Sequence, residues 1–271
     1  MAIREPEIPR NDRTRPDLLA GVEAARIASE CSARDMALLL YSSDTDVLLA
    51  LLANPQFGEG EALVLLNRRD LPRPVVQALA NVDTLVNVYA VKLALAKHPR
   101  TPLRTALEQL KFLYLFDLVA VCLRPGVLAE VKRVSEELIL AQLPKLAIGQ
   151  RITLARRGSA RLAASLLIGE NRQITSAVLD NPYLTEAALL SVLSRPDCPE
   201  GVVQCIAGHA KWGLRYDIRL ALLRNSSLPF AQALLILPYL KARDIDAMSQ
   251  DPSVLPEVRK ALENRLKYSK T

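Results

Sequence analysis

The sequence has little glycine and few aromatic residues. Glycine accounts for 10 of the 271 residues, and aromatic side chains make up only 4% of the chain. The scarcity of glycine argues against a fold rich in tight hairpins or phosphate-binding loops. The scarcity of aromatics argues against sheets, which favour aromatic and β-branched residues. Leucine and alanine dominate, half of all residues are hydrophobic, and this composition is typical of close-packed helices rather than disorder.

Long hydrophobic runs are also missing. The longest apolar stretch, Phe112 to Leu123, has 12 residues and includes Asp117, whereas a helix that spans a bilayer needs roughly 20 residues. Residues 1–18 are polar, charged and proline-containing, so we expect no secretory signal. The net charge of +6 permits an anionic partner without demanding one. These features predict a soluble, cytoplasmic protein with no membrane span.

The sequence lacks the motifs of common catalytic and cofactor sites. It contains no GxGxxG, GxxxxGK[ST], HExxH or GxSxG pattern. We expect its two histidines, His98 and His209, to cap helices or face solvent. Its four cysteines form no CxxC pair and are expected to be buried, inert thiols. These absences predict a non-enzymatic protein without a metal or a cofactor. The cysteines are Cys31, Cys122, Cys198 and Cys205.

The strongest positive feature of the sequence is an internal repeat. When Asn54-Pro55 is aligned with Asn181-Pro182, an offset of 127 positions, 12 of the 27 positions from 54 to 80 are identical. The same frame persists from about residue 20 to the C-terminus. Self-similarity at a fixed period is the signature of a repeat architecture. We predict a tandem duplication, with a flexible arm at 1–16 and two blocks, 17–143 and 144–271, that form one continuous solenoid.

Prolines and capping residues divide each block into short helices. In the first block, with Asp70 as the N-cap of the third helix, we expect helices over 44–53, 59–67, 73–80, 84–97, 102–110, 113–123 and 126–143. Helices this short are marginal alone and need neighbours that cover their apolar faces. The sequence therefore predicts an all-α fold without strands, an α-solenoid of short stacked helices.

The repeated pattern joins an apolar helix, Asn-Pro, a short link containing Glu, a Leu-rich helix, Arg-x-Asp-x-Pro and a Val-Val helix. It reads in full from Ala53 to Ala80 and from Asp180 to Ala207. This pattern resembles the bacterial HEAT-like and variant leucine-rich repeat proteins, which are α-solenoids. The resemblance implies a fold and says little about activity. Variant leucine-rich repeat proteins can carry an iron–sulfur module on clustered cysteines, and because this sequence has no such cluster, no cofactor is carried over.

The most suggestive polar feature is a basic and aromatic face on the fourth helix of each block. There a tyrosine and a cation lie three residues apart, on one side of the helix. In the second block two further cations are expected to extend this face as a stripe, beside a tryptophan. Such a stripe can hold phosphates and stack bases. Equally, the rings can fill gaps between helices while the cations reach solvent. The residues concerned are Tyr89, Lys92, Lys211, Trp212, Arg215, Tyr216 and Arg219.

These observations leave three functions open. Solenoids mostly bind proteins or peptides, so the leading hypothesis is a non-enzymatic interaction or scaffold module with a protein or peptide partner. The alternative is nucleic-acid binding through the basic and aromatic face. The weakest hypothesis is a HEAT-like DNA glycosylase, which would need an acid beside an exposed tryptophan; Asp217 and Trp212 are the candidates.

Overall fold

The computed structural model describes residues 22–169 and 171–269 of the chain. All regular structure in these ranges is helical, which confirms the predicted all-α class. The chain divides into two compact units, Met1–Ser135 and Glu136–Thr271. The division falls within α9 (Ala129–Gln142), earlier in the chain than the expected boundary between residues 143 and 144. The arm expected at residues 1–16 lies outside the described residues. No helix within the described ranges has the length and apolar character to cross a bilayer.

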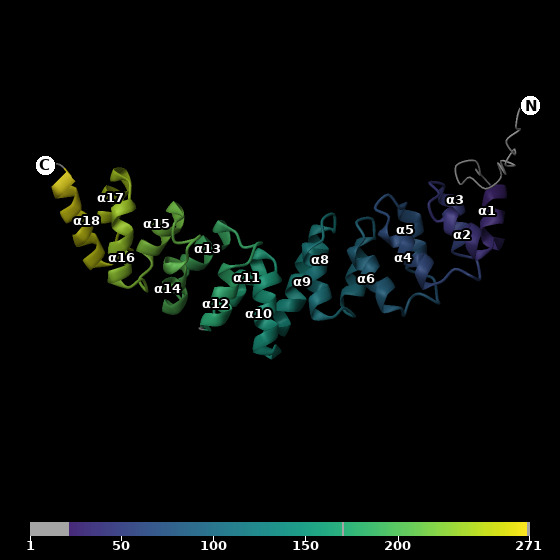
Figure 1. Ribbon diagram of the computed structural model, residues 1–271, viewed down its shortest axis with the longest axis horizontal. Coiled ribbons are helices and arrows are strands. Elements are labelled where there is room, and N and C mark those ends of the chain that lie inside the picture. Colours follow the sequence, from purple (N-terminus) through teal and green to yellow (C-terminus); the bar gives the residue numbers. More distant parts are fainter. Residues whose placement is uncertain (1–21, 170, 270–271) are drawn as a thin grey trace, which may run out of the picture. The chain divides into compact units, whose positions relative to one another are not determined.

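In the first unit, helices that are next but one in sequence pack against each other (Figure 1). The helices before α9 are α1 (Val22–Glu30), α2 (Ala33–Leu39), α3 (Thr45–Leu51), α4 (Glu59–Asn67), α5 (Arg73–Leu79), α6 (Tyr89–Lys97), α7 (Leu103–Leu110) and α8 (Leu115–Leu123). α1 packs on α3 and α3 on α5, whereas α4 packs on α6 and α6 on α8. α6 also packs on α7, so this unit is a stack of two helical layers.

The second unit has the same construction. After a short 3-10 turn, its helices are α10 (Ile148–Arg157), α11 (Ala160–Leu166), α12 (Arg172–Leu179), α13 (Glu186–Leu193), α14 (Glu200–Gly208), α15 (Tyr216–Arg224), α16 (Phe230–Ile236), α17 (Ala242–Ser249) and α18 (Pro256–Ser269). In one layer α10 packs on α12 and α12 on α14. In the other layer α11 packs on α13 and α13 on α15. Each unit is thus a solenoid-like stack of short helices.

The helix boundaries repeat at the offset found in the sequence. α6 begins at position 89 and ends at 97, and α15 begins at 216 and ends at 224. α9 and α18 are related in the same way, since they begin at 129 and 256 and end at 142 and 269. The same helices therefore recur in the same order at one spacing.

Two buried asparagines make the same contacts in the two units. Asn54 Nδ2 donates to the carbonyl oxygens of Ala28 and Cys31, each at 3.1 Å. Asn181 Nδ2 donates to the corresponding carbonyl oxygens, those of Ala155 and Gly158, at 2.6 and 3.0 Å. Each asparagine follows one helix of a layer. It therefore connects the end of that helix to the last turn of the preceding helix in the same layer, and to the loop after that preceding helix. This explains why both Asn-Pro pairs are prominent in the repeat.

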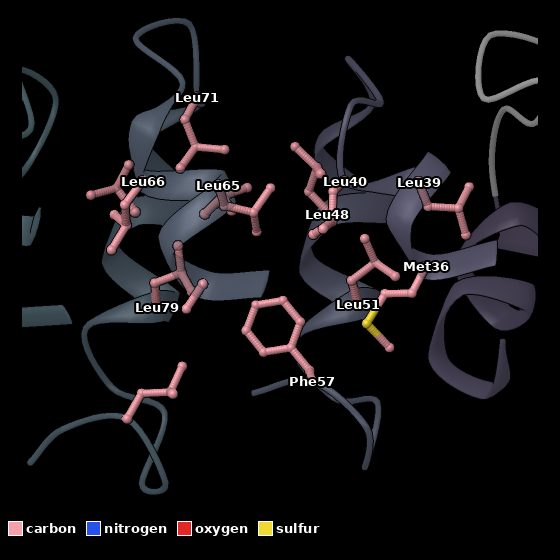
Figure 2. Packing of buried hydrophobic residues seen from close by; sticks show 14 of the residues in the cluster. Met36, Leu39, Leu40, Leu48, Leu51, Phe57, Leu65, Leu66, Leu71 and Leu79 are labelled. Carbon is pink, nitrogen blue, oxygen red and sulfur yellow. The ribbon is translucent and has the colours of Figure 1, made fainter. Parts of the chain in front are cut away.

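The leucines of each short helix are covered by the helices around it. Leu51 of α3, Leu65 of α4 and Leu79 of α5 are completely buried, and Figure 2 shows the side chains of these helices gathered in one cluster. Burial of one such side chain contributes about 1.5–3 kcal/mol. The contacts supply the stability that helices of this length lack alone.

Two local expectations were wrong. α6 begins at Tyr89 and not at residue 84. The N–H groups of Leu85 and Val86 donate to the carbonyl oxygen of Val82, and the turn that they form places the Leu85 side chain in the core. Asp70 does not cap the third predicted helix, α5, whose N-cap is Pro72. The Asp70 carboxylate is instead bound by the guanidinium of Arg68 at 2.8 Å.

Candidate functional site

The two tyrosines of the predicted basic and aromatic face bind neighbouring helices. The Tyr89 hydroxyl donates to Asp117 Oδ2 at 2.5 Å and accepts the N–H of Tyr114 at 3.1 Å. Burial, followed by the hydrogen bond to Asp117, raises the pKa of Tyr89. Tyr216 makes the corresponding pair of hydrogen bonds, to Asp244 Oδ2 at 2.5 Å and from the N–H of Lys241 at 3.0 Å. The hydroxyls therefore fix the start of α6 to α8, and the start of α15 to α17.

The cations of the same face lie over aromatic rings of the protein itself. Lys92 Nζ is 4.0 Å from the ring centroid of Phe112, and the Arg219 guanidinium carbon is 4.4 Å from that of Tyr239. The two rings are themselves 127 positions apart. Phe112 is 57% exposed and Tyr239 62%, so each ring still has a large surface in solvent. Cation–π contacts of this kind contribute about 0.5–1 kcal/mol at exposed sites.

The predicted stripe in the second unit is wrong, because its first members do not lie on a helix. Lys211 lies in a turn and Arg215 is the N-cap of α15, so neither extends the face of that helix. Trp212 is only 3% exposed, and its Nε1 donates to the Leu179 carbonyl at 2.8 Å. Trp212 aligns with Leu85 of the first unit, which is also buried. The alignment of Trp212 with a leucine was the signal in the sequence that could have predicted a core position for the tryptophan. A ring held in this way cannot stack on a base.

The cysteines behave as predicted from their scattered positions. Cys31, Cys122 and Cys198 are buried and Cys205 is partly buried, and none forms a disulfide. Burial is the main cause that raises the pKa of Cys31 and of Cys198. A raised pKa lowers the fraction of reactive thiolate, so these two thiols are core groups.

A different feature recurs in both units: a groove beside the ends of two adjacent helices. The first groove lies between α4, α6 and the residues after α8 and has a volume of about 370 Å³. The second groove lies between α13 and α15 and has a volume of about 440 Å³. Both volumes fall in the range of ligand-binding clefts, about 300–1,000 Å³. The equivalent positions that line both grooves are Leu63/Leu190, Leu66/Leu193, Asn67/Ser194, Arg69/Pro196, Ala94/Ala221, Lys97/Arg224, His98/Asn225 and Pro99/Ser226.

The floor of each groove is aliphatic. Leu63, Leu66 and Leu93 line the first groove together with alanines, and Leu190 and Leu193 line the second. Neither groove is lined by Phe, Tyr or Trp, and the imidazole of His98, which lines the first groove, is only 5% exposed. The floor is therefore suited to aliphatic side chains and offers no platform for a base.

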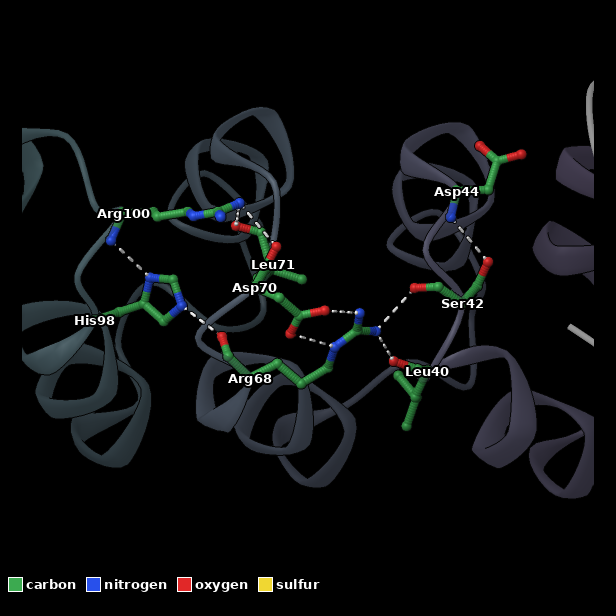
Figure 3. Close-up of polar contacts among 8 residues, drawn as sticks. All are labelled: Leu40, Ser42, Asp44, Arg68, Asp70, Leu71, His98 and Arg100. Carbon is green, nitrogen blue, oxygen red and sulfur yellow. Dashed lines mark hydrogen bonds and ion pairs between the residues drawn. The ribbon is translucent and has the colours of Figure 1, made fainter. Parts of the chain in front are cut away.

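A polar network fixes one side of the first groove (Figure 3). The Arg68 side chain is only 13% exposed. Its Nη1 donates to the carbonyl oxygens of Leu40 and Ser42, at 2.6 and 2.9 Å. Its Nη2 donates to Asp70 Oδ2 at 2.8 Å, and hydrogen bonding by Arg68 is the main cause that lowers the pKa of Asp70. A single guanidinium thus joins the end of α2, the loop before α3 and the end of α4.

His98 continues this network to the next helix. It is the C-cap of α6, as predicted, and its Nε2 lies 2.8 Å from the Arg68 carbonyl oxygen. Its Nδ1 accepts the backbone N–H of Arg100 at 3.2 Å. The ring is therefore neutral and carries its proton on Nε2. Burial lowers the pKa of His98, which favours this neutral form. The C-terminal ends of α2, α4 and α6 are consequently held in one arrangement.

Comparison of the chain with protein-family models, curated proteins and solved structures gives no match. The grooves are therefore the features of this chain from which a function can be inferred. Three cations of the first groove, Arg69, Lys97 and Arg124, were not recognised as site residues from the sequence. The available signal was the alignment of Lys97 with Arg224, two cations at the ends of equivalent helices.

Proposed function

We propose that the chain is a non-enzymatic binding module of the HEAT-like solenoid type, and that its grooves hold segments of a protein partner. The observation that carries this proposal is the recurrence of a groove at equivalent positions in both units. An aliphatic floor gains about 25 cal/mol for each Å² of apolar partner surface that it removes from water. Stacked helical repeats commonly present such surfaces to peptides.

The proposal can be tested by filling the grooves. Ala94 and Ala221 occupy the same position in the first and second grooves and are partly buried. Peptides are selected from a random displayed library on the wild-type chain and then measured on Ala94→Phe, Ala221→Phe and the double variant. We expect each selected peptide to bind at least about tenfold more weakly to the variant whose groove it occupies, because the added ring fills the cleft.

Ala187→Phe is the matched control, because Ala187 is exposed on α13 and lines neither groove. It adds the same ring and should leave peptide affinity unchanged. Peptides that bind the wild-type chain and all three groove variants equally would contradict the proposed site. A library that yields no binder to the wild-type chain would contradict the proposed function itself.

Nucleic-acid binding is the second candidate, and one observation favours it. The link before α8 and the first turn of α8 expose three aromatic rings, Phe112, Tyr114 and Phe116, at 57%, 71% and 43%. Lys92 lies against the first of them. Stacking on such rings contributes about 1–3 kcal/mol per base. Absence of single-stranded DNA and RNA binding at low salt would remove this candidate, as would binding that Phe112→Ala with Tyr114→Ala leaves unchanged.

A further inference from the structure

The two grooves share many equivalent lining positions but differ in charge. The first groove is lined by Arg69, Lys97 and Arg124, and no acidic residue lines it. Among the described residues, no carboxylate forms an ion pair with any of these three cations. An aliphatic floor with unpaired cations at its edge is complementary to a segment that carries both apolar and negatively charged side chains.

In the second groove the corresponding charges are removed or neutralised. Arg69 is replaced by Pro196, and Arg124 by Asp251. Lys97 is replaced by Arg224, whose Nε lies 3.0 Å from Asp251 Oδ2.

The remaining cation of the second groove, Arg195, is also paired, with Asp197 at 3.1 Å. Hydrogen bonds from Ser253, followed by one from Arg224, lower the pKa of Asp251, so this carboxylate is ionised at neutral pH. The second groove therefore has no unpaired positive charge comparable to that of the first.

Helix dipoles do not explain this difference. Arg69, Lys97 and Arg124 each lie at the C-terminal end of a helix, where a cation interacts favourably with the dipole. The same helix ends exist in the second unit, yet two of the three positions there hold Pro196 and Asp251. If the cations served only the helix ends, both units would benefit from them equally.

We infer that the first groove selects an acidic segment of a protein partner and that the second groove does not. This inference rests on the proposed function and adds the chemistry of the partner to it. Apolar side chains of the segment lie on Leu63 and Leu66, and its carboxylates pair with Lys97 and Arg124. The groove has no Phe, Tyr or Trp and its one imidazole, that of His98, is buried, which favours a polypeptide over a single-stranded nucleic acid as the occupant.

The test exchanges the residue that differs most between the grooves. Arg124→Asp places a carboxylate beside Lys97, as Asp251 lies beside Arg224, and Asp251→Arg reverses the change in the second groove. Two labelled peptides serve as probes, one in which leucine alternates with glutamate and one in which it alternates with glutamine. We expect Arg124→Asp to weaken binding of the glutamate peptide about five- to tenfold at low salt, and Asp251→Arg to strengthen it severalfold. The glutamine peptide should be unaffected by either variant.

Arg73→Asp is the matched control, because it changes the net charge equally from an exposed position outside the groove. Arg124→Gln, which adds no carboxylate at the end of α8, should show about half of the loss in binding free energy and guards against a folding defect. Thermal unfolding of each variant shows whether the fold is kept.

Each outcome decides a separate point. Equal binding of the two peptides would overturn the acidic preference and leave the proposed function in place. Equal weakening by Arg73→Asp would show a general surface-charge effect and overturn the inference. Displacement of the glutamate peptide by a single-stranded oligonucleotide that binds more tightly through Arg124 would assign the groove to nucleic acid. Failure of both peptides to bind the wild-type chain would contradict the proposed function together with the inference.

Discussion

His98 and Asn225 lie 127 positions apart and form similar hydrogen bonds, although one side chain is an imidazole and the other an amide. The Asn225 Nδ2 donates to the carbonyl of Leu193 at 2.8 Å, and its Oδ1 accepts the N–H of Ser227 at 2.9 Å. His98 likewise accepts the N–H of Arg100, the counterpart of Ser227, but its Nε2 contacts the carbonyl of Arg68, two residues beyond the counterpart of Leu193. Both residues connect the end of a helix to the preceding helix of the same layer, but only the histidine titrates near neutral pH.

We predict that His98 makes the first unit sensitive to acid. Burial lowers the pKa of His98 below the value of 6.5 that it has in the unfolded chain. The unfolded chain therefore binds a proton first as the pH falls, and this favours unfolding. The contribution of His98 to stability is fully present above pH 6.5 and is lost as the pH decreases towards its pKa in the folded protein. Urea unfolding at a series of pH values measures this loss.

His98→Asn is the matched variant, because Asn225 shows that an amide at this position can connect the corresponding helices of the second unit. We expect it to fold and to show a smaller decrease in the free energy of unfolding between about pH 7 and pH 5, the interval in which an ordinary histidine titrates. An identical pH dependence in the two chains would show that the acid sensitivity arises elsewhere.

We predict that Arg68 cannot be replaced by lysine, whereas Arg195 can. Arg68 donates to two backbone carbonyl oxygens and to Asp70 from a side chain that is 13% exposed. A lysine cannot reproduce this planar set of donors, so Arg68→Lys should lower the free energy of unfolding by about 2–3 kcal/mol. Arg195 is 42% exposed and, within the part of the chain that the structure describes, pairs only with Asp197, so Arg195→Lys should cost less than about 1 kcal/mol. Equal losses in chemical denaturation would contradict the role assigned to Arg68.

The helices were largely predictable from the sequence because their ends carry local signals. α4 spans residues 59–67, as predicted, since proline, glycine and an acidic first turn mark where it can begin. The Asn-Pro pairs were recognised through the repeat, and both asparagines prove to be buried. Signals of this kind depend on a few neighbouring residues and on the helical period.

The candidate site was less predictable because it depends on side chains from distant segments. Lys97 and Arg124 are on different helices and line one groove only because α4, α6 and α8 pack side by side. Trp212 was expected beside a basic stripe and is instead a core residue, because the segment before α15 turns and directs the ring to the Leu179 carbonyl. A turn before a helix is set by packing that a helical period cannot reveal.

We predict that Asn54 and Asn181 stabilise their units by similar amounts. Replacement of either asparagine by alanine removes a buried donor and leaves two backbone carbonyl groups without their partner. Each variant should lower the free energy of unfolding by about 2–4 kcal/mol. Asn87→Ala is the control, because Asn87 is exposed, and it should change stability by less than about 0.5 kcal/mol. A loss at Asn54 without a comparable loss at Asn181 would argue against their equivalence.

We predict that a single buried charge disrupts the unit that contains it. Leu66 is 6% exposed and Leu193 is 3% exposed, at the same position of α4 and α13. Leu66→Asp or Leu193→Asp would place a carboxylate that has no partner between packed helices. Such a change lowers the free energy of unfolding by several kcal/mol more than a typical surface mutation does. Hydrogen exchange followed by mass spectrometry should show lost protection over the first unit for Leu66→Asp and over the second unit for Leu193→Asp.

The control Leu235→Asp, at a position 73% exposed, should leave protection unchanged. Protection lost throughout the chain by either buried variant would show that the two units unfold as one, whereas protection retained everywhere would contradict the packing of these leucines.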